Sequence, residues 1–440
     1  MKKSTIIIFF AFAIMQTQAQ DYMISFAASG DTTGLATIKV DNITSGASVT
    51  LAGGDVLHLI PSVGIGTPEI ENRNLQLFPN PMVNESSLTF VVPEAGNASV
   101  SIVDLSGRTV CRTTKLLSPG PQSFRIYGIG QGVYFVNVTS KSYTCSTKLI
   151  SQNPVQSEAG IVFAAANRNT KVKYAKSTAE TVDMPYTDGD ILMYKGNAGQ
   201  YSNVVTDVPT GSKTVTFNFI ACTDSDGNHY ATVQIGEGKY LQTWMAENLK
   251  VGVHVNGVQE QTNNGIIEKY CSADLGANCD VYGGLYQWGE MVQYYNGASN
   301  TTSWDPAPAG NIAGICPVGW HLPTEDEWCA LTLFLDPTVD CNGNGMIGTY
   351  IGGMMKETGT DHWSSPNTGA TNNAGFTILP GGYRNLDGSY GQLHLGADYW
   401  PASELSPTQV WDRYFYYNKA NISRTINPKA QGYSVRCMKD

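Results

Sequence analysis

The sequence predicts a multidomain protein with a mostly β N-terminal half, including an antiparallel β-sandwich, and an α+β C-terminal domain. Three observations support this fold class. The length of 440 residues corresponds to about three domains of ordinary size. Glycine is abundant, at 46 residues, and only 15% of residues are charged, against about 25% in ordinary soluble proteins. All eight tryptophans lie between Trp244 and Trp411, which indicates a domain boundary near residue 222.

The composition excludes two broad classes of protein. A hydrophobic content of 42% with 23 tyrosines is enough to build cores, so the chain is not disordered as a whole. Lysine and arginine number 27 against 37 acidic residues, which gives a net charge of −10. This balance argues against a nucleic-acid partner, because phosphate binding needs a high density of basic side chains.

The first 19 residues have the pattern of a signal peptide. Lys2 and Lys3 form a positive start, and the apolar run 6–15 suits a signal-peptide core but is too short to span a bilayer. Thr17 and Ala19 are small residues at the two positions that a signal peptidase reads, so we expect cleavage after Ala19. A buried strand or a short membrane anchor is the alternative interpretation.

Export follows from this segment. Cleavage would leave a net charge of −12, because the removed part carries two lysines and no acidic residue. No later run is long and apolar enough to retain the chain, so we expect no transmembrane anchor. No cysteine lies near the cleavage point, so a lipid anchor is not expected. The expected location is extracellular or on the outer cell surface, with the periplasm as the alternative.

Nine cysteines lie in the mature chain, and an exported chain meets oxidising conditions, so disulfides are expected. The odd number leaves one thiol free or paired with another chain. No Cys-x-x-Cys and no His-x-x-x-His occurs, which argues against a zinc site. We expect Cys222 to be left over and the others to form four pairs, namely Cys111–Cys145, Cys271–Cys279, Cys329–Cys341 and Cys316–Cys437.

Short β-prone runs with glycine-rich gaps fill the N-terminal half. They divide it into a β-rich segment at 20–70, a sandwich of about seven strands at 72–151, and a second β-rich segment at 155–221. The segments that flank the sandwich are weakly similar to each other. Chance similarity, a duplicated β unit, or one β domain with the sandwich inserted would each explain this.

The C-terminal domain, residues 222–440, combines short helices with strands and long loops. Apolar side chains at spacings of three and four residues predict one helical face there. Its members are Leu285, Trp288, Val292 and Tyr295. A second helix is expected to begin in the run 323–328 and to end near Asp336 and Pro337.

Three consecutive acids at the start of this second helix allow two interpretations. Glu325, Asp326 and Glu327 could form an acid/base cluster. However, Thr324 and Glu327 have the spacing of a capping box, in which each side chain bonds the other residue's backbone N–H. Acids in the first turn also suit the helix dipole. We therefore assign these residues to structure.

Residues 224–228, with the sequence Asp-Ser-Asp-Gly-Asn, resemble the start of a calcium loop. An EF-hand loop needs a Glu at its twelfth position, where this sequence has Ile235. Asp226 and Gly227 stand between two strand-like runs, which predicts a hairpin turn. Another calcium geometry is the alternative.

The remaining reactive residue types show no catalytic pattern. The six histidines are scattered without ligand spacing, and no Gly-x-Ser-x-Gly elbow is present. A Ser/His/Asp triad stays an open alternative. Cys316 or Cys437 could act as a nucleophile, but disulfide pairing would remove the reactive thiolate of both. We assign no catalytic residue, no metal ligand and no cofactor.

Four aromatic loops of the C-terminal domain combine Trp and Tyr with Asn, Asp and Arg. Sugars bind when their C–H faces stack on aromatic rings beside polar groups, although the same residues also build ordinary cores. Candidate ligand-binding residues are Trp363, Asn367, Tyr383, Arg384, Asn385, Trp400, Trp411 and Asp412.

A series of motifs runs in order through the C-terminal domain. They are Asp226–Asn228, Gln242–Leu249, Tyr282–Trp288, Cys316–Thr324 with Glu327 and Trp328, Gly381–Arg384, Tyr399–Trp400 and Gly432–Cys437. They resemble the Fibrobacter succinogenes major paralogous domain family, which is more distantly similar to the formylglycine-generating enzyme and C-type lectin folds. The resemblance implies a C-type-lectin-like fold. The enzyme's copper-binding cysteine pair and the lectins' Glu-Pro-Asn have no counterpart here, so neither activity is carried over.

Residues 75–150 show a second resemblance. The matching runs are Leu77–Pro81, Val103–Arg108, Gly132–Phe135 and Lys148–Leu149. They are similar to a type A sorting domain of the type IX secretion pathway in Bacteroidetes. Such domains normally end a chain, whereas 290 residues follow here, so a role as a β-sandwich spacer is the alternative to sorting.

These observations give a leading functional hypothesis and two alternatives. We expect an exported, non-catalytic surface or secreted protein whose lectin-like domain binds a glycan or a surface protein, as in adhesion. The first alternative is an enzyme on a formylglycine-generating-like fold. The second is a structural component of a surface layer.

Overall fold

The computed structural model describes residues 21–61, 75–92, 96–105, 107–117, 120–140, 144–153, 159–164 and 179–440. The signal peptide predicted at 1–19 lies outside these residues. The chain divides into two compact units, of which the first combines Met1–Ser62 with Ser177–Asp440 and the second is Val63–Lys176. Within the described ranges, no helix has the length and apolar character needed to cross a membrane.

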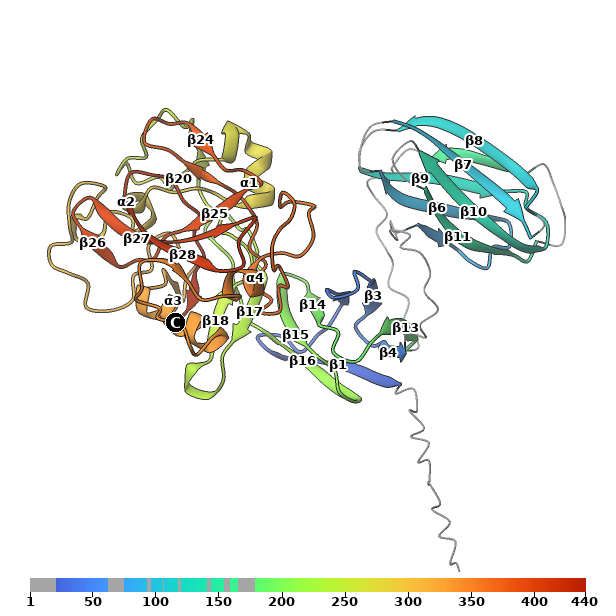
Figure 1. The fold of residues 1–440 in the computed structure, drawn as a ribbon, viewed down its shortest axis with the longest axis horizontal. Coiled ribbons are helices and arrows are strands. Elements are labelled where there is room, and N and C mark those ends of the chain that lie inside the picture. Colours follow the sequence, from blue (N-terminus) through green and yellow to red (C-terminus); the bar gives the residue numbers. More distant parts are fainter. Residues whose placement is uncertain are drawn as a thin grey trace, which may run out of the picture. The chain divides into compact units, whose positions relative to one another are not determined.

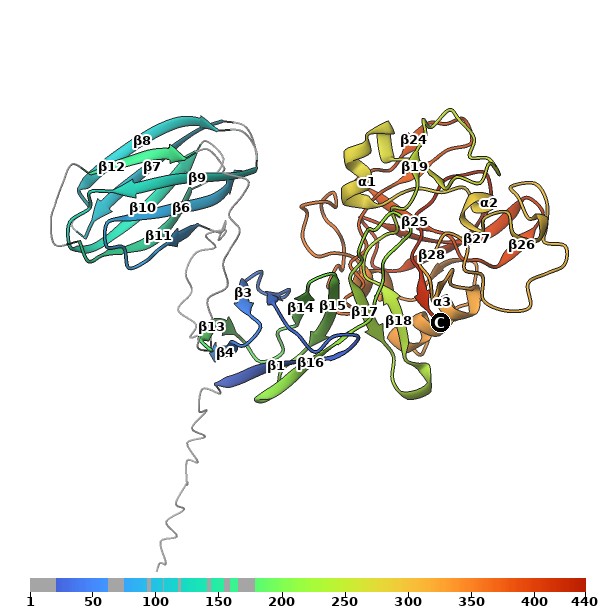
Figure 2. The same ribbon diagram turned by 180° about the vertical axis from the view of Figure 1, so that it is seen from behind.

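The described part of the second unit forms two four-stranded antiparallel sheets (Figures 1 and 2). Their strand orders are β11-β10-β7-β8 and β12-β9-β6-β5. Side chains that alternate along the strands form one core, which includes Leu88, Val100, Phe124 and Val136. The strands are β5 (Gln76–Phe78), β6 (Glu85–Val92), β7 (Gly96–Asp104), β8 (Thr109–Leu117), β9 (Gly120–Tyr127), β10 (Gly132–Ser140), β11 (Thr144–Ser151) and β12 (Gly160–Ala164).

The disulfide predicted between Cys111 and Cys145 is wrong, because Cys111 is a free thiol. Cys111 lies on β8 and Cys145 on β11, which are opposite edges of one four-stranded sheet. Three strand spacings separate them by ~14 Å. Disulfides need α-carbons within about 7 Å. Burial raises the pKa of the Cys111 thiol to about 11.

The first unit begins with eight strands from two separate stretches of sequence. They form a sheet of order β13-β4-β1-β16 and part of a larger sheet in which β14 pairs with β2. Strands from before residue 62 thus pair with strands from after residue 177, as in one β domain with the sandwich inserted. The strands are β1 (Tyr22–Gly30), β2 (Thr37–Asn42), β3 (Ser48–Ala52), β4 (Val56–Pro61), β13 (Thr181–Tyr186), β14 (Leu192–Ala198), β15 (Tyr201–Asp207) and β16 (Lys213–Phe219).

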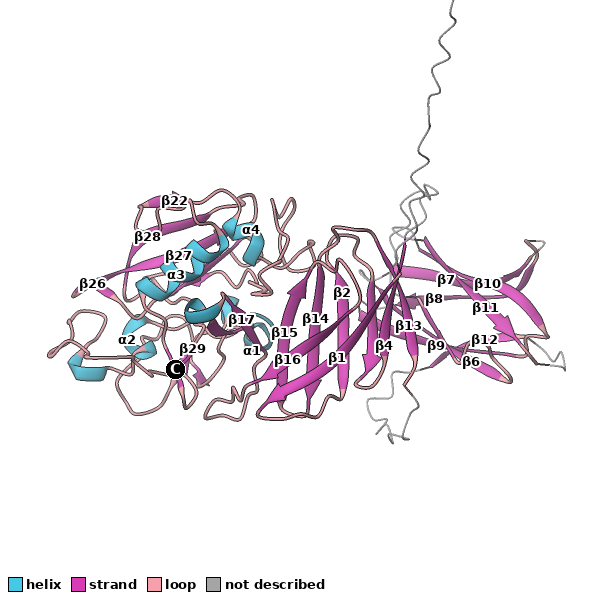
Figure 3. Ribbon diagram, turned by 90° about the horizontal axis from the view of Figure 1, so that it is seen from below, coloured by secondary structure: helices cyan, strands magenta, loops and turns pink. Residues whose placement is uncertain are grey.

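The larger sheet joins this β region to the C-terminal region. Its order is β21-β29-β18-β17-β15-β14-β2-β3, and the join is the parallel pairing of β15 with β17 (Figure 3). Its strands in the C-terminal region are β17 (Thr232–Ile235), β18 (Gln242–Met245), β21 (Trp320–His321) and β29 (Met438–Lys439). A continuous sheet therefore positions the residues just before and after β18.

A second sheet and several short elements complete the C-terminal region. The sheet has the order β22-β28-β27-β25, with β26 paired to β27. Its strands are β22 (Gly345–Ile347), β25 (Gly396–Tyr399), β26 (Glu404–Ser406), β27 (Gln409–Tyr416) and β28 (Ile422–Pro428). Two short pairs are β19 (Val253–His254) with β20 (Glu268–Lys269) and β23 (Tyr383–Arg384) with β24 (Tyr390–Gly391).

The α-helices of the described residues lie in the C-terminal region, as Figure 3 shows in cyan. They are α1 (Gly276–Tyr282), α2 (Trp288–Met291), α3 (Glu325–Leu335) and α4 (Ile351–Met355), and the 3-10 turns are η1 (Gly238–Tyr240), η2 (Ser272–Asp274) and η3 (Tyr295–Gly297). The prediction of a multi-sheet, mostly β protein with small helical content in its C-terminal part is confirmed.

The start of α3 confirms the predicted capping box. The Thr324 hydroxyl accepts the backbone N–H of Glu327 at 3.2 Å, and the Glu327 carboxylate accepts that of Thr324 at 2.8 Å. The helix ends at Leu335, before Asp336 and Pro337. Glu327 therefore caps the N-terminus of α3.

The helix predicted from the face at 285–295 is much shorter than its apolar spacing indicated. The α-helix α2 covers Trp288–Met291 alone. Gln293, Tyr294 and Asn296 have positive φ angles of 52°, 51° and 50°, which a right-handed helix does not accommodate. Leu285, Trp288 and Val292 of the predicted face are buried, whereas Tyr295 is exposed.

Three disulfides join cysteines of the C-terminal region. They are Cys271–Cys279, Cys316–Cys437 and Cys329–Cys341, the same pairs as expected from the sequence. Cys222 is a free thiol with 3% exposure. The pair Cys316–Cys437 spans 121 residues and ties the segment before β21 to the segment before β29.

A buried ion cluster fixes the start of α3 to the second sheet. Glu325 Oε1 and Oε2 lie 3.0 and 3.1 Å from Arg413 Nη1 and Nη2, and Glu325 Oε2 lies 2.7 Å from Arg424 Nε. The Arg413 and Arg424 side chains are 1% and 7% exposed. One carboxylate thus neutralises only one of two buried guanidinium charges.

Asp412 and Asp398 form a buried acidic pair on the other face of this sheet from the two arginines. Burial raises the pKa of Asp412 above its ordinary value, although its carboxylate accepts the backbone N–H of Thr425 at 3.0 Å and the Thr425 hydroxyl at 2.6 Å. Burial and the neighbouring Asp412 raise the pKa of Asp398 well above its ordinary value. Asp398 lacks the hydrogen bonds from Thr425, so we place the proton of this pair on Asp398.

His321 lies in a second buried ion cluster. Its side chain is 2% exposed, with Nε2 at 3.0 Å from Glu327 Oε1 and Nδ1 at 2.8 Å from Asp440 Oδ1. Burial alone would lower the pKa of His321, but the hydrogen bonds with Glu327 and Asp440 outweigh it and raise that pKa above 6.5. Carboxylates on both ring nitrogens favour the imidazolium form.

This arrangement predicts a pH-dependent stability. Because the folded-state pKa of His321 exceeds the unfolded value, its contribution is complete below about pH 6.5 and is lost as the pH rises through the folded pKa. His321→Gln should therefore destabilise the protein more at acidic than at alkaline pH. Urea unfolding of both proteins across this range measures the difference, and an equal loss at every pH would contradict the assignment.

Candidate functional site

The structure places Trp363 and Trp400 in the core, contrary to their predicted role as ligand-stacking residues. They are 1% and 0% exposed. Their ring N–H groups donate to the carbonyl oxygens of Ile378 at 3.0 Å and Tyr286 at 2.8 Å. A ring that is buried on both faces cannot stack on a sugar. Sequence spacing did not distinguish packing from recognition.

Three further candidates are buried by internal contacts. Asp412 Oδ1 accepts the backbone N–H of Thr425 at 3.0 Å, Asn367 Nδ2 donates to the carbonyl oxygen of Glu357 at 2.8 Å, and Arg384 Nη2 lies 2.8 Å from Glu260 Oε1. Their exposures are 0%, 5% and 1%. Their polar groups already serve the fold, which contradicts a role in direct ligand contact.

Three candidates remain partly accessible. Tyr383, Asn385 and Trp411 are half-buried. The Arg424 guanidinium covers the Trp411 ring at 3.5 Å from its centroid, so one face of that ring is occupied. None of the eight predicted residues lines the pocket described next.

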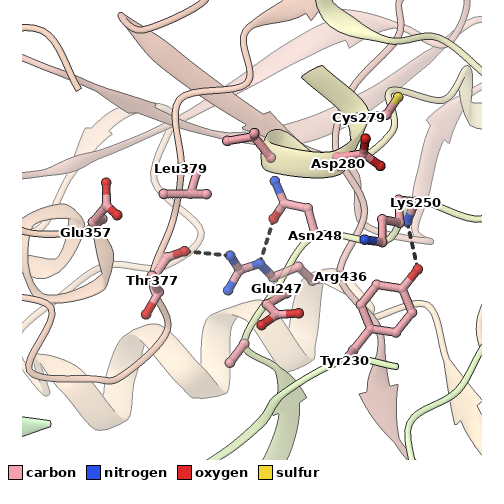
Figure 4. A pocket seen from close by; sticks show the side chains of 13 residues that line it. Tyr230, Glu247, Asn248, Lys250, Cys279, Asp280, Glu357, Thr377, Leu379 and Arg436 are labelled. Atoms are coloured by element: carbon pink, nitrogen blue, oxygen red, sulfur yellow. Dashed lines mark hydrogen bonds between the residues drawn. The ribbon is translucent and has the colours of Figure 1, made fainter. Parts of the chain in front are cut away.

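A pocket of about 280 Å³ lies where the segment after β18, the helix α1 and the segment before β29 meet (Figure 4). Its size is at the lower end of ligand sites, which suits one side chain or one monosaccharide. It is lined by Tyr230, Ala246, Glu247, Asn248, Lys250, Cys279, Asp280, Val281, Gly283, Glu357, Thr377, Leu379 and Arg436.

The floor of the pocket is held by Arg436, which is 1% exposed. Its Nε donates to Asn248 Oδ1 at 2.8 Å and its Nη2 donates to the carbonyl oxygen of Thr377 at 2.9 Å (Figure 4). Its Nη1 donates to the carbonyl oxygen of Phe376. Burial lowers the pKa of the guanidinium. These acceptors fix the side chain and use its donors within the protein.

Asn248 completes the floor. Its Oδ1 also accepts the Tyr399 hydroxyl at 2.9 Å, and its Nδ2 donates to the carbonyl oxygen of Tyr282 at 2.8 Å. Asn248 thus connects β25 with the end of α1 and the segment after β18. The floor is a fixed hydrogen-bonded surface.

One wall is formed by Tyr230 and the turn that precedes it. The Tyr230 hydroxyl donates to Asp224 Oδ2 at 2.5 Å and accepts the backbone N–H of Lys250 at 3.0 Å. Asp224 also accepts the backbone N–H groups of Asp226 and Asn228 at 3.0 and 2.9 Å. The segment 224–228 is therefore a hydrogen-bonded hairpin turn, as its Asp-Gly pair indicated.

The rim carries four ionisable side chains. Glu247 Oε1 lies 2.9 Å from Lys195 Nζ, and Glu357 Oε2 lies 2.8 Å from His362 Nδ1. Asp280 is exposed, and the side chain of Lys250 is half-buried. Figure 4 shows Glu357 on one side of the floor and Asp280 and Lys250 on the other.

Sequence reasoning did not single out these pocket residues as a site. Glu247 and Asn248 lie inside the motif 242–249 and Arg436 inside the motif 432–437, so the sequence singles them out only as part of a family resemblance. Their meeting depends on the pairing of β18 with β29, which connects residues nearly 200 positions apart. Among the described residues, no three His, Cys, Asp or Glu side chains group closely enough to hold a metal ion.

Comparisons with known proteins identify two regions of the chain. The model of the Fibrobacter succinogenes major domain matches residues 233–439, and that of the secretion system C-terminal sorting domain matches residues 76–152. No curated protein matches the chain.

Among solved structures, the chain is similar to a fimbrial protein from Bacteroides ovatus ATCC 8483. The identity is 10%, the match covers 96% of this chain and 99% of the other, and the TM-score is 0.18. A TM-score this low supports neither a shared fold nor a shared function.

Both resemblances drawn from the sequence motifs are confirmed. A sorting domain implies export to the outer surface, and the three disulfides are consistent with an extracytoplasmic location. The chain therefore carries a Fibrobacter succinogenes major domain at residues 233–439 and a secretion system C-terminal sorting domain at residues 76–152.

Proposed function

We propose that this chain is a non-catalytic surface protein whose C-terminal domain recognises a glycan or protein ligand in the pocket above Asn248 and Arg436. The observation that carries the proposal is a fixed polar floor below a charged rim. A preformed site loses little conformational freedom on binding, which favours affinity. The expected C-type-lectin-like fold belongs to the same proposal.

The chemistry of the lining supports recognition more than catalysis. Cys279 is bonded to Cys271, so it has no thiolate to act as a nucleophile. Burial and the hydrogen bond to Asp224 raise the pKa of Tyr230 far above its ordinary value, so its hydroxyl stays protonated. Among the described residues that line the pocket there is no histidine, the usual general base.

Leu379→Trp should abolish ligand binding. Leu379 is a half-buried wall residue, so the larger indole would occupy the cavity while the hydrogen bonds of Asn248 and Arg436 stay intact. The full chain and the variant would be applied to a glycan array and a peptide array. Signals given by the parent chain should fall by about tenfold or more.

Asp326→Asn is the matched control, because Asp326 is an exposed residue of α3 outside the pocket lining. This variant should keep the signals of the parent chain. Binding that survives Leu379→Trp, or a parent chain that binds neither array, would contradict the proposal. Chemical conversion of a bound ligand would favour the enzyme alternative.

A further inference from the structure

The pocket presents an excess of negative charge to a ligand. Its lining contains the carboxylates of Glu247, Asp280 and Glu357 and the cations of Lys250 and Arg436. The Arg436 guanidinium is 1% exposed and donates to acceptors of the floor, so it is not available to a ligand. Lys250 and Arg436 offset two of the three carboxylates, because the acceptors of Arg436 are neutral. The lining therefore presents a net charge of −1 to a bound cation.

Two of these carboxylates are oriented by side chains from outside the lining. Lys195 Nζ bonds Glu247 and His362 Nδ1 bonds Glu357; the side chains are 36% and 44% exposed in the first pair and 34% and 23% exposed in the second. Partly exposed pairs of this kind contribute little free energy. Lys195 and His362 thus position the carboxylates, while a ligand cation can replace them as the closest partner.

The apolar part of the lining is mainly aliphatic. It includes Ala246, Val281 and Leu379, and Tyr230 is 2% exposed. A sugar would need an accessible aromatic face, and within the described lining only Tyr230 is aromatic. A lysine side chain has the complementary form, with an apolar methylene stem and a charged end.

We propose that this pocket binds the lysine side chain of a protein ligand. The methylene groups would lie against Ala246, Val281 and Leu379, and the ammonium group would lie between Glu357 and Asp280. This inference rests on the proposed function, because it uses the same pocket and names the chemistry of its ligand.

Acidic pH should weaken this binding through His362. The groups that face His362 are the Glu357 carboxylate, Asp361, the Tyr282 ring at 5.8 Å between centroids, and His394, whose Nδ1 lies 2.9 Å from the His362 carbonyl oxygen. The hydrogen bond with Glu357 raises the pKa of His362 above its ordinary value. As the pH falls through that pKa, the imidazolium binds Glu357 more strongly and competes with the ammonium group.

The test is a ligand-observed NMR titration of the full chain with Nα-acetyl-lysine methylamide at about pH 8. This probe should bind about tenfold more tightly than its ε-acetylated form or the norleucine analogue, which keep the stem without the charge. Glu357→Gln and Asp280→Asn should each weaken binding about fivefold, whereas Asp326→Asn should change it by less than about twofold. Binding should weaken towards about pH 5.5, and His362→Gln should remove that decrease.

The outcomes separate this inference from the proposed function. Equal affinity for lysine and its ε-acetylated form, with both lost in Leu379→Trp, would overturn the inference and keep the pocket as the recognition site. Tighter binding of glucosamine than of lysine would overturn the inference that the ligand is a protein. Lysine binding that survives Leu379→Trp, or no lysine binding, would also overturn the inference, and the array experiment would then decide the proposed function independently.

Discussion

Glu325→Gln should lower the free energy of unfolding of the first unit by about 3–5 kcal/mol. The Glu325 carboxylate bonds both Nη atoms of Arg413 at 3.0 and 3.1 Å and Nε of Arg424 at 2.7 Å. An amide cannot neutralise a guanidinium group, so the two arginines would stay buried without this counter-charge. Urea unfolding followed by tryptophan fluorescence measures the change, because all eight tryptophans lie in this unit.

Asp326→Asn is the control for this measurement too. Asp326 is the next residue of α3, and it is exposed, so its substitution removes the same charge from the same helix turn. Its expected loss is below about 1 kcal/mol. If the two variants unfold at the same urea concentration, the buried cluster does not contribute as we describe.

Replacing both Cys316 and Cys437 by Ser should destabilise the first unit by about 5 kcal/mol relative to the oxidised protein. This disulfide joins residues 121 positions apart, so its removal releases a large loop in the unfolded chain. The cost of closing a loop increases with the logarithm of its length. Urea unfolding without reductant measures the loss.

The pair Cys271–Cys279 provides a matched comparison, because its residues are 8 positions apart. The corresponding double replacement should cost about 2.5 kcal/mol. A larger loss for the short loop than for the long one would contradict the loop-entropy explanation. It would indicate that local packing around α1, next to the pocket, determines the contribution of each disulfide.

Local patterns were the part of this structure that the sequence predicted well. The capping box of Thr324 and Glu327 and the turn at 224–228 form between residues at most four positions apart, so their spacing is sufficient. The face at 285–295 was wrong in length, because consecutive positive φ angles end α2 after Met291. Apolar spacing carries no information on such backbone angles.

Arrangements that depend on strand order could not be predicted. The sequence predicts a local disulfide between Cys111 and Cys145, but the sheet order places these cysteines on opposite edges. The loops that contain Trp363 and Trp400 have the composition of a recognition surface, but both side chains are packed in the core. The pocket around Asn248 and Arg436 arises from the pairing of β18 with β29, which no local pattern specifies.

Hydrogen–deuterium exchange of the full chain shows whether this pocket is the recognition site. With saturating Nα-acetyl-lysine methylamide, we expect slower exchange in the pocket segments 246–250, 279–283 and 376–379. We expect no change in 409–428, which comprises β28 and the strand β27 that carries Trp411. Protection confined to 409–428, with none in the pocket segments, would refute recognition at this pocket.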